Sequence, residues 1–267
     1  MEQHYHTVLT IAGSDSSGGA GVQADIKSIC ANGGYAASVV TATTAQNTCK
    51  VTDIHPVPIA HLIAQMEAVL SDIKIDAVKI GMLHAAETID AVQRTLAAYT
   101  PEHIVLDPVM VATSGDRLMD GNAIERLKVF FPDVTLITPN IPEASLLLDK
   151  EITRDNMEMC AKELGERYCV SVLLKGGHLP LDEVMTDILY HYRTKEIISI
   201  KNPMIKTNNL HGTGCTLSSA IATYLARGEG LEEAVMKGSR YLNQAIEAGK
   251  ERKLGKGAGP VNHFFVL

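Results

Sequence analysis

Short β-branched runs alternate along this chain with longer stretches of helical period, and no other feature limits the possible folds as strongly. The alternation is typical of parallel strands joined by crossover helices. Six runs are predicted to be such strands: 7–12, 37–43, 76–80, 103–106, 134–137 and 170–174. Two further runs, 187–193 and 196–200, are separated only by Thr194 and Lys195, so a hairpin must join them.

The helical stretches carry one apolar stripe each. Ile59, Leu62, Ile63, Met66 and Leu70 fall on one face of a helix, and the same spacing recurs within 217–225 and 231–246. The pattern predicts an α/β fold with a doubly wound, mostly parallel central sheet and helices on both faces. With 267 residues, no internal repeat and no linker-like tract, we expect a single domain over 1–267.

Composition excludes several classes of partner. The 24 basic and 31 acidic residues give a net charge of −7 without a Lys/Arg run, so neither nucleic acid nor an anionic membrane is an expected partner. No apolar run approaches the roughly 18 residues of a membrane span. The five cysteines are scattered without a C-x-x-C pair, which predicts neither disulfides nor a zinc site and favours the reducing cytoplasm.

In a doubly wound sheet, ligands bind beyond the carboxyl ends of the strands, where the strand order reverses. The polar and glycine-rich segments of this chain do follow its predicted strands. They are 13–21, 44–48, 81–82, 107–116, 138–143 and 175–178. One shared site is therefore expected at this edge.

The segment 209–215, Asn-Leu-His-Gly-Thr-Gly-Cys, directly precedes an amphipathic helix. A glycine turn and a helix N-terminus together present N–H groups that could hold a phosphoryl group in transfer. On spacing alone, a plain glycine turn explains it equally well. Cys215 would sit in the first helical turn, where the helix dipole lowers the pKa of a thiol towards neutrality. A buried, inert cysteine is the ordinary alternative.

The segment 13–21, Gly-Ser-Asp-Ser-Ser-Gly-Gly-Ala-Gly, follows the first strand and opens a helix. It matches neither the G-x-G-x-x-G fingerprint of dinucleotide-binding proteins nor a P-loop. Its bare backbone would allow a flat small molecule to approach closely. The alternative is a strand-to-helix turn without a ligand.

Two carboxylates and one lysine follow neighbouring strands. Asp107 and Glu143 are hard oxygen donors of the kind that Mg²⁺ uses together with water and phosphate, although each could equally be a cap or turn residue. Lys175 ends a run that is apolar apart from one serine, where an unpaired ammonium is rare. A phosphate is its natural partner, and the alternative is a side chain that extends to solvent.

Three further side chains could surround a flat ring. The amide of Gln46 could pair with a donor and an acceptor on a heterocycle edge, or could simply be loop polarity. Met82 and Val109 would supply apolar walls, or they are ordinary core residues.

Together these segments resemble the hydroxymethylpyrimidine/phosphomethylpyrimidine kinase family of the ribokinase-like superfamily. The resemblance rests on eight segments in order along nearly the whole chain. They are GSDSSGGAGVQAD at 13–25, TAQNT at 44–48, DAVKIGML at 76–83, DPVMVATSGDRL at 107–118, TPNIPEA at 138–144, KGGH at 175–178, HGTGCTLSSAI at 211–221 and GPVNHF at 259–264.

The resemblance implies ATP-dependent phosphorylation of the hydroxymethyl group of 4-amino-5-hydroxymethyl-2-methylpyrimidine, and of its monophosphate, in thiamine biosynthesis. ATP and Mg²⁺ are the implied cofactors, and a homodimer is implied. Cys215 would activate the substrate hydroxyl beside an anion hole of Gly212, Thr213 and Gly214. The other implied roles are pyrimidine binding (Gly13, Ala20, Asp25, Gln46, Met82 and Val109), Mg²⁺ binding (Asp107 and Glu143) and ATP phosphate binding (Asn140 and Lys175).

One position departs from the family pattern. Where the family commonly has A-K-x-Y, residues 238–241 read Gly-Ser-Arg-Tyr, so Ser239 replaces a lysine that could neutralise phosphate. The departure weakens the prediction of a second phosphorylation.

Other activities remain as alternatives. Pyridoxal kinases of this subclass share the Gly-Thr-Gly-Cys segment and accept a similar ring with a hydroxymethyl arm. A thiol enzyme could use Cys215 as nucleophile with His211, and a protein that only binds ligands would need no thiol beside two carboxylates. A dehydrogenase is least favoured, because the fingerprint spacing is missing.

Overall fold

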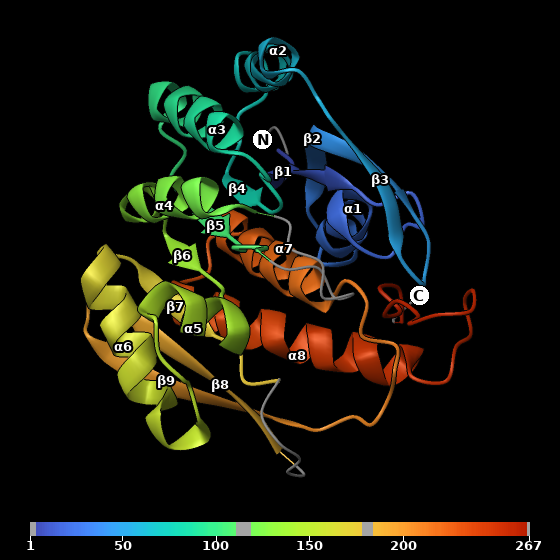
Figure 1. The fold of residues 1–267 in the computed structure, drawn as a ribbon, viewed down its shortest axis with the longest axis vertical. Helices are drawn as coiled ribbons and strands as arrows, with labels where there is room; N and C mark the ends of the chain where they lie inside the picture. The colour runs from blue at the N-terminus through green and yellow to red at the C-terminus, as the bar shows by residue number, and fades with distance from the viewer. Residues whose placement is uncertain (1–3, 111–118, 178–183, 266–267) are drawn as a thin grey trace.

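The described strands form one nine-stranded sheet in the order β3-β2-β1-β4-β5-β6-β7-β8-β9 (Figure 1). The computed structural model describes residues 4–110, 119–177 and 184–265. The strands are β1 (Thr7–Ser14), β2 (Tyr35–Gln46), β3 (Val51–Pro56), β4 (Ala77–Ile80), β5 (Ile104–Leu106), β6 (Leu136–Ile137), β7 (Ser171–Leu174), β8 (Val184–His191) and β9 (Glu196–Pro203). The helices are α1 (Gly21–Ala31), α2 (Ile59–Leu70), α3 (Ala86–Tyr99), α4 (Gly121–Phe130), α5 (Ile141–Leu148), α6 (Met157–Tyr168), α7 (Thr213–Ala226) and α8 (Leu231–Gly249), with 3-10 turns η1 (Phe131–Asp133) and η2 (Arg154–Asn156).

The direction of the strands confirms the predicted doubly wound, mostly parallel sheet. Strands β2, β1, β4, β5, β6 and β7 are parallel to one another. At one edge β3 is antiparallel to β2; at the other, β8 is antiparallel to β7 and β9 is antiparallel to β8. The chain leaves β1 towards β2 and β3, then returns to place β4 on the other side of β1. The carboxyl ends of β1 and β4 therefore flank the reversal at which ligands bind in such sheets.

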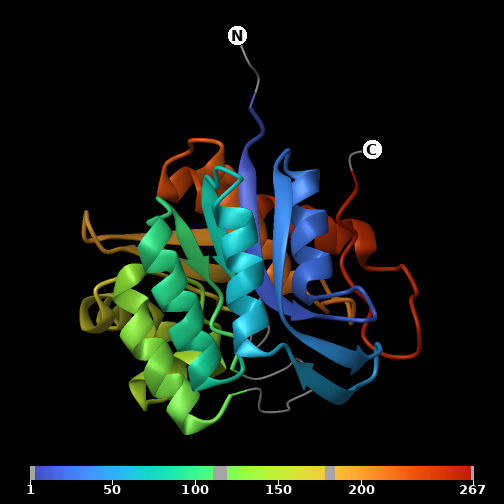
Figure 2. The ribbon, with the colours of Figure 1, turned by 90° about the horizontal axis from the view of Figure 1, so that it is seen from above.

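Helices cover both faces of the sheet, as Figure 2 shows from above. In β5, Ile104 and Leu106 belong to the core shared with α2 to α6, whereas Val105 belongs to the core shared with α1, α7 and α8. Because both faces are buried, the central strands are continuous apolar runs. This is why they could be recognised from the sequence.

The predicted helices are confirmed. Leu62 and Met66 of the expected α2 stripe are fully buried. Helix α7 is buried along most of its length between the sheet and α8, and α8 buries the side that carries Val235 and Ala245. None of the helices in the described part of the chain is both long and apolar enough to cross a bilayer.

The sequence prediction missed β3. Its side chains are half-buried or exposed, so it has no apolar face to mark it as a strand, and it pairs only with β2. Because of this partner β2 continues beyond its predicted end at residue 43. Thr44 and Gln46 therefore lie in a strand, not in a loop after it.

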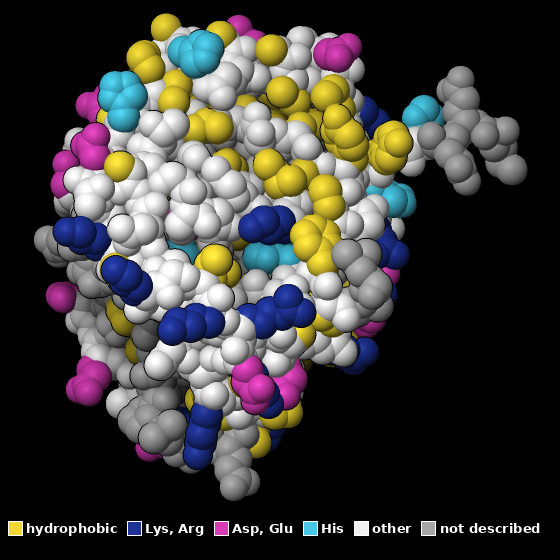
Figure 3. Space-filling model, turned by 90° about the vertical axis from the view of Figure 1, so that its right-hand side faces the viewer, with side chains coloured by type: hydrophobic (Ala, Val, Ile, Leu, Met, Phe, Trp, Pro, Cys, Tyr) yellow, Lys and Arg dark blue, Asp and Glu magenta, His cyan; other side chains and the backbone are white. Residues whose placement is uncertain are grey.

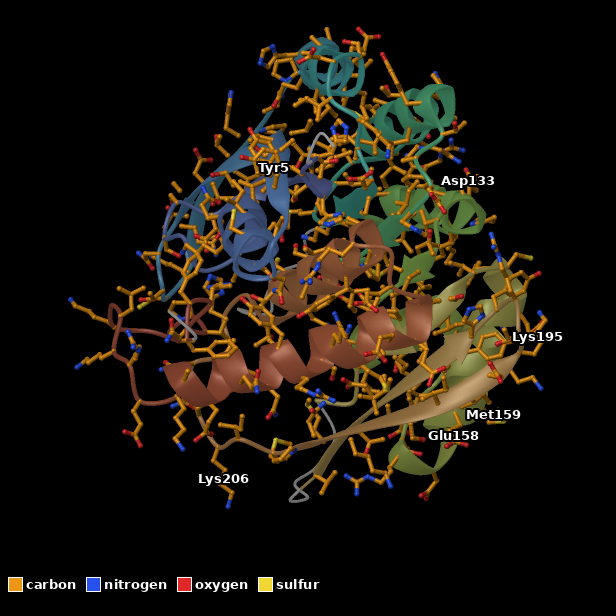
Figure 4. The ribbon with its side chains drawn as sticks, turned by 180° about the vertical axis from the view of Figure 1, so that it is seen from behind. Tyr5, Asp133, Glu158, Met159, Lys195 and Lys206 are labelled. Atoms are coloured by element: carbon orange, nitrogen blue, oxygen red, sulfur yellow. The ribbon has the colours of Figure 1, made fainter. Side chains whose placement is uncertain are left out.

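The predicted β8–β9 hairpin is confirmed, although its turn spans residues 192–195 and β8 ends earlier than expected. The hairpin is bound to α6. Lys195 forms an ion pair with Glu166 at 2.9 Å, and the Ser199 hydroxyl donates to Glu158 at 3.2 Å. Figure 4 labels Lys195 and Glu158 on this side of the molecule.

Candidate active site

The loops after β5, β6 and β7 meet the start of α7 at the carboxyl edge of the sheet. A parallel bridge joins Asn140 to Lys175, which links the loops after β6 and β7. A Cβ built on Gly214 of α7 would lie 3.0 Å from Asp107 Oδ2 and 3.4 Å from Lys175 Nζ. The structure therefore brings together groups from four separate segments, as the single-site prediction requires.

Helix α7 begins at a glycine turn without a side-chain cap. Gly212 is the N-cap residue and has a φ of 80°, and a Cβ there would lie 1.9 Å from the Gly19 carbonyl oxygen. Glycine is required on both counts. The Thr213 N–H donates to the Leu210 carbonyl at 3.3 Å. No described acceptor binds the N–H of Gly214 or Cys215. These two donors lie at the positive end of the helix, where an anion is stabilised.

Asp107, which is buried, and Lys175, which is half-buried, form an ion pair at the floor of the site. Lys175 Nζ lies 2.9 Å from Asp107 Oδ1, and the Thr138 hydroxyl donates to the same oxygen at 3.0 Å. Within the described residues no hydrogen bond reaches Asp107 Oδ2, which faces Gly214. Asp107 thus keeps one carboxylate oxygen for a ligand beside the helix start.

Asn140 and Glu143 form a capping box at the start of α5. The Asn140 side chain accepts from the Glu143 N–H, and Glu143 Oε2 accepts from the Asn140 N–H, both at 2.9 Å. Both side chains therefore already have a structural role in the protein without ligands. Their predicted roles at phosphate and Mg²⁺ stay predictions.

Charge and burial set the protonation of this group of residues. Burial raises the pKa of Glu143 to about 7, with Lys175 opposing the shift and Asp107 adding to it. For Lys175, burial would lower the pKa, but the carboxylates of Asp107 and Glu143 outweigh it and raise the pKa above its usual value. The site thus combines a lysine whose pKa is raised with a glutamate, Glu143, whose pKa is raised to about 7.

The Cys215 thiol lies where two helices begin. Cys215 is in the first turn of α7, and the backbone at the start of α1 (Gly21) lies near enough to favour its charged form. Burial nevertheless raises the pKa of Cys215 to about 11, with Asp25 and Asp107 adding to the rise and Lys79 opposing it. The predicted shift towards neutrality was therefore wrong, because desolvation and two carboxylates outweigh the helix ends.

The residues predicted around the pyrimidine lie at the ends of β1, β2, β4 and β5. A Cβ on Gly13 would lie 2.5 Å from Met82 Cε, so these two residues are in contact. Gln46 lies over the loop after β1, where its backbone N–H donates to Ser16 Oγ at 2.8 Å. Ala20 and Val109 are half-buried in the neighbouring loops. The predicted ring contacts themselves stay predictions.

Asp25 is placed differently from the other predicted ligands. It is fully buried and forms an ion pair with Lys79 at 2.8 Å. Its carboxylate also accepts hydrogen bonds from Thr10 at 2.6 Å and Ser219 at 2.8 Å. Each of these partners belongs to the protein, so a contact between Asp25 and a substrate stays a prediction. Sequence reasoning missed Lys79, although a lysine inside a buried strand is itself a sign of an acidic partner.

Sequence reasoning also missed Asp15. Its carboxylate accepts hydrogen bonds from the N–H groups of Ser17, Gly19 and Ala20, and pairs with His211 Nε2 at 2.8 Å. Burial would raise the pKa of Asp15, but His211 and the hydrogen bonds outweigh it and hold the pKa far below its usual range. Asp15 thus joins the loop after β1 to the turn before α7.

The Asp15–His211 pair also bears on the thiol-enzyme alternative. Because His211 Nε2 is bound to Asp15 Oδ2, this nitrogen does not activate Cys215. A thiol nucleophile needs a base within hydrogen-bond reach. The geometry therefore offers no support for a Cys–His nucleophile.

Two of the quoted motifs run beyond the described residues. The segment 107–118 continues past Met110, and the segment 175–178 continues past Gly177. Their described parts include Asp107 and Lys175, which carry the geometry given above.

Comparison with known proteins agrees with this arrangement. A family model described as Phosphomethylpyrimidine kinase matches residues 15–262. The chain is 44% identical over 259 residues to the hydroxymethylpyrimidine/phosphomethylpyrimidine kinase of Salmonella typhimurium, covering 96% of each. It is 48% identical over 259 residues to the thiamine biosynthesis bifunctional protein ThiED of Geobacter sulfurreducens, covering 96% of this chain but only 52% of that longer protein.

Among solved structures, the chain resembles the ADP complex of Bacillus subtilis pyridoxal kinase. The TM-score is 0.89 at 31% identity, over 97% of this chain and 98% of that one. This likeness agrees with the ribokinase-like architecture expected from the sequence. The family model, in contrast, spans nearly all of the segments that meet at the site, from Asp15 to the turn before α7 and beyond. The chain belongs to the phosphomethylpyrimidine kinase family.

Proposed function

We propose that the protein transfers the γ-phosphoryl group of ATP to the hydroxymethyl group of 4-amino-5-hydroxymethyl-2-methylpyrimidine, and then to its monophosphate, in thiamine biosynthesis. The observation that carries the proposal is the uncapped start of α7, where Gly214 lies against Lys175 and Asp107 and is followed by Cys215. Such a site suits charge that develops on a phosphoryl group. A relative named as this kinase, 44% identical over 96% of its length, supports it.

The residues of the site have two roles in the reaction, stabilisation of charge on the phosphoryl group and acceptance of a proton. The N–H groups of Gly214 and Cys215 and the ammonium of Lys175 stabilise the phosphoryl group while its bond to the donor oxygen breaks and its bond to the acceptor oxygen forms. The thiolate form of Cys215 takes the proton that the acceptor hydroxyl loses and becomes the thiol. Because phosphoryl transfer depends mainly on positioning and charge, the fixed helix start contributes most.

Asp107 and Glu143 fit a Mg²⁺ ion of the kind that keeps several waters. Asp107 Oδ2 is free among the described residues, and Glu143 offers the lone pairs that the α5 cap leaves unused. No group of three or more potential ligands occurs among the described His, Cys, Asp and Glu, so substrate phosphates and water would complete the shell. Mg²⁺ supplies neutralisation of charge on the phosphate oxygens.

Position 239 bears on the second transfer. Ser239 is 3% exposed and accepts a hydrogen bond from Asn202 at 2.7 Å, so it brings no cation to a product phosphate. We expect the monophosphate to be accepted, with a lower kcat/KM than the free alcohol.

A pyridoxal kinase activity is the second candidate, because the fold matches pyridoxal kinase at a TM-score of 0.89. A coupled assay of ADP release with the pyrimidine, its monophosphate and pyridoxal side by side separates the two. The proposal requires the pyrimidine to have the highest kcat/KM and requires Cys215→Ala to lose most of that activity. If pyridoxal is the best acceptor, the assignment changes; if both ligands bind and no ADP forms, the protein only binds them.

The proposal also includes a homodimer in the cytoplasm. One feature supports the homodimer and another supports the compartment. Tyr5 and Tyr35 are 76% and 47% exposed with ring centroids 5.4 Å apart, and Figure 3 shows apolar side chains gathered near the N-terminal chain. The five free cysteines suit a reducing compartment. Light scattering of the purified protein measures the oligomer, and Tyr35→Lys should weaken it.

A further inference from the structure

The C-terminal strap, residues 259–263, has no part in the site described so far, yet it lies directly behind the start of α7. After α8 the chain turns back towards this helix (Figure 1). We propose that the strap is a positioning element for the anion hole, and that His263 is the residue through which it acts. The kinetic part of this inference rests on the proposed phosphoryl transfer.

His263 is tied to the glycine turn through one hydroxyl. Thr216 is fully buried, and its Oγ1 lies 2.8 Å from the Gly212 carbonyl oxygen and 2.9 Å from His263 Nε2. The carbonyl only accepts, so the Thr216 hydroxyl donates to it, and His263 Nε2–H donates to the hydroxyl oxygen. The hydrogen bonds thus assign the ring proton to Nε2.

The surroundings of His263 keep this donor in place. The residue is 4% exposed, and burial lowers its pKa to about 4, with Lys27 adding to the shift. The ring is therefore neutral at physiological pH. One end of the strap thus holds the carbonyl side of Gly212, the residue with the left-handed conformation.

The other end of the strap holds the chain that enters the turn. The His211 N–H donates to the Gly259 carbonyl at 3.2 Å, and the Gly259 N–H donates to Asn209 Oδ1 at 3.1 Å. The turn is therefore held by the strap both before and after Gly212.

Helix α8 makes the strap rigid. The Tyr241 hydroxyl donates to the His263 carbonyl at 3.0 Å, and the Asn262 N–H donates to the Ala245 carbonyl at 3.0 Å. Val261 is 4% exposed in the core between α7 and α8. The strap thus transmits the position of α8 to the start of α7.

A helix start that binds an anion needs support of this kind. A side-chain cap would occupy the N–H groups that the ligand requires, and α7 has no such cap at Gly212. The turn must then be held from its carbonyl side, which is where Thr216 and His263 act. Misplacement of a reacting group by about 1 Å can cost about 100-fold in rate.

The test compares two substitutions of the same residue. His263→Leu removes the donor, and we expect kcat to fall about 10- to 100-fold while KM for ATP and for the pyrimidine changes less than roughly 3-fold. His263→Gln can donate from nearly the same place as Nε2 and should recover most of the loss. Thr216→Val removes the hydroxyl at similar volume, so adding it to His263→Leu should cost little more.

A readout without catalysis separates this inference from the proposed function. Hydrogen exchange of the peptide 210–217, measured without substrates, should be faster in His263→Leu than in the native protein and near native in His263→Gln. Ile246→Val, a core substitution in α8, is the matched control and should keep native kcat.

The inference is overturned if His263→Leu keeps native kcat and native exchange, or if Ile246→Val loses kcat to the same extent. It is also overturned if the fold-loss of kcat in the double variant equals the product of the losses in Thr216→Val and His263→Leu. If His263→Leu does not fold, faster exchange at 210–217 in Thr216→Val supports the strap, and unchanged exchange overturns it.

Discussion

Cys215 combines a position suited to catalysis with a pKa that opposes ionisation. It lies in the first turn of α7 and is followed there by buried residues, yet burial and nearby carboxylates raise its pKa to about 11. The thiol is therefore neutral near pH 7 in the protein without ligands. A base that is mostly protonated gives a rate that rises with pH.

This leads to a prediction for the pH profile. With Mg²⁺ and substrates saturating, we expect the single-turnover transfer rate to rise about tenfold per pH unit between pH 7 and 9, because the thiolate fraction rises by that factor. Cys215→Ala, which has no ionisable group at this position, should be slower and should lack this slope. A flat profile for the native protein would show that Cys215 orients the hydroxyl but does not take its proton.

Asp187 gives a residue-scale prediction about stability. It is 3% exposed, and burial raises its pKa to about 6, with the Gly176 N–H and Lys175 opposing the shift. A carboxyl with a raised folded-state pKa contributes stability below about pH 4 and loses it as pH rises through 6. Asp187→Asn keeps an acceptor for the Gly176 N–H and does not ionise.

As pH rises from 4 to 8, the free energy of unfolding of Asp187→Asn should therefore increase relative to that of the native protein, by on the order of 2 kcal/mol. Urea unfolding at both pH values measures the difference. If the difference in free energy of unfolding between the two proteins is the same at both pH values, the raised pKa of Asp187 is contradicted.

At the scale of elements, the start of α7 can be altered without loss of the helix. Gly214 lies in the first turn, and a Cβ there would lie 3.0 Å from Asp107 Oδ2 and 3.4 Å from Lys175 Nζ. Alanine is a better helix former than glycine by up to about 1 kcal/mol. The added methyl group would nevertheless occupy the space in which we place the phosphoryl group.

We predict that Gly214→Ala keeps its melting temperature within a few degrees while kcat/KM falls at least about 100-fold, as when an oxyanion donor is lost. Gly121→Ala is the matched control, because Gly121 begins α4 and no described atom lies within 4 Å of its added Cβ. Native activity in Gly214→Ala would place the phosphoryl group elsewhere.

At the scale of the whole molecule, one buried ion pair and its hydrogen-bond partners join four elements, since Thr10 of β1 also donates to Asp25. Lys79 of β4 and Asp25 of α1 are both fully buried, and Ser219 of α7 donates to the same carboxylate at 2.8 Å. Burial would lower the pKa of Lys79, but Asp25 outweighs it and raises the pKa. Removing one partner of such a pair leaves an uncompensated charge, which costs about 3–5 kcal/mol.

A double-mutant cycle tests this structural role. Lys79→Met alone should lose about 3–5 kcal/mol of unfolding free energy, and Asp25→Asn added to it should restore much of the loss. Urea unfolding measures the stability, and KM for the pyrimidine measures any ligand role. If the stable double variant has a much higher KM, Asp25 contacts the substrate as the family resemblance implies.

The sequence alone determined the parallel strands, the β8–β9 hairpin and the helices α2, α7 and α8, and that most of the functional side chains follow the strands. These features depend on local periodicity and on glycine turns, which a few neighbouring residues establish. It missed β3 because an exposed edge strand such as Val51–Pro56 has no buried face to create a pattern.

The tertiary structure decided the rest: the pairing of Asp25 with Lys79 and of Asp15 with His211, the strap behind α7, and the direction of the Cys215 pKa shift. Each of these depends on groups that are distant in the chain but adjacent in space. Desolvation depends on everything packed around a group, so no local pattern of residues can report it.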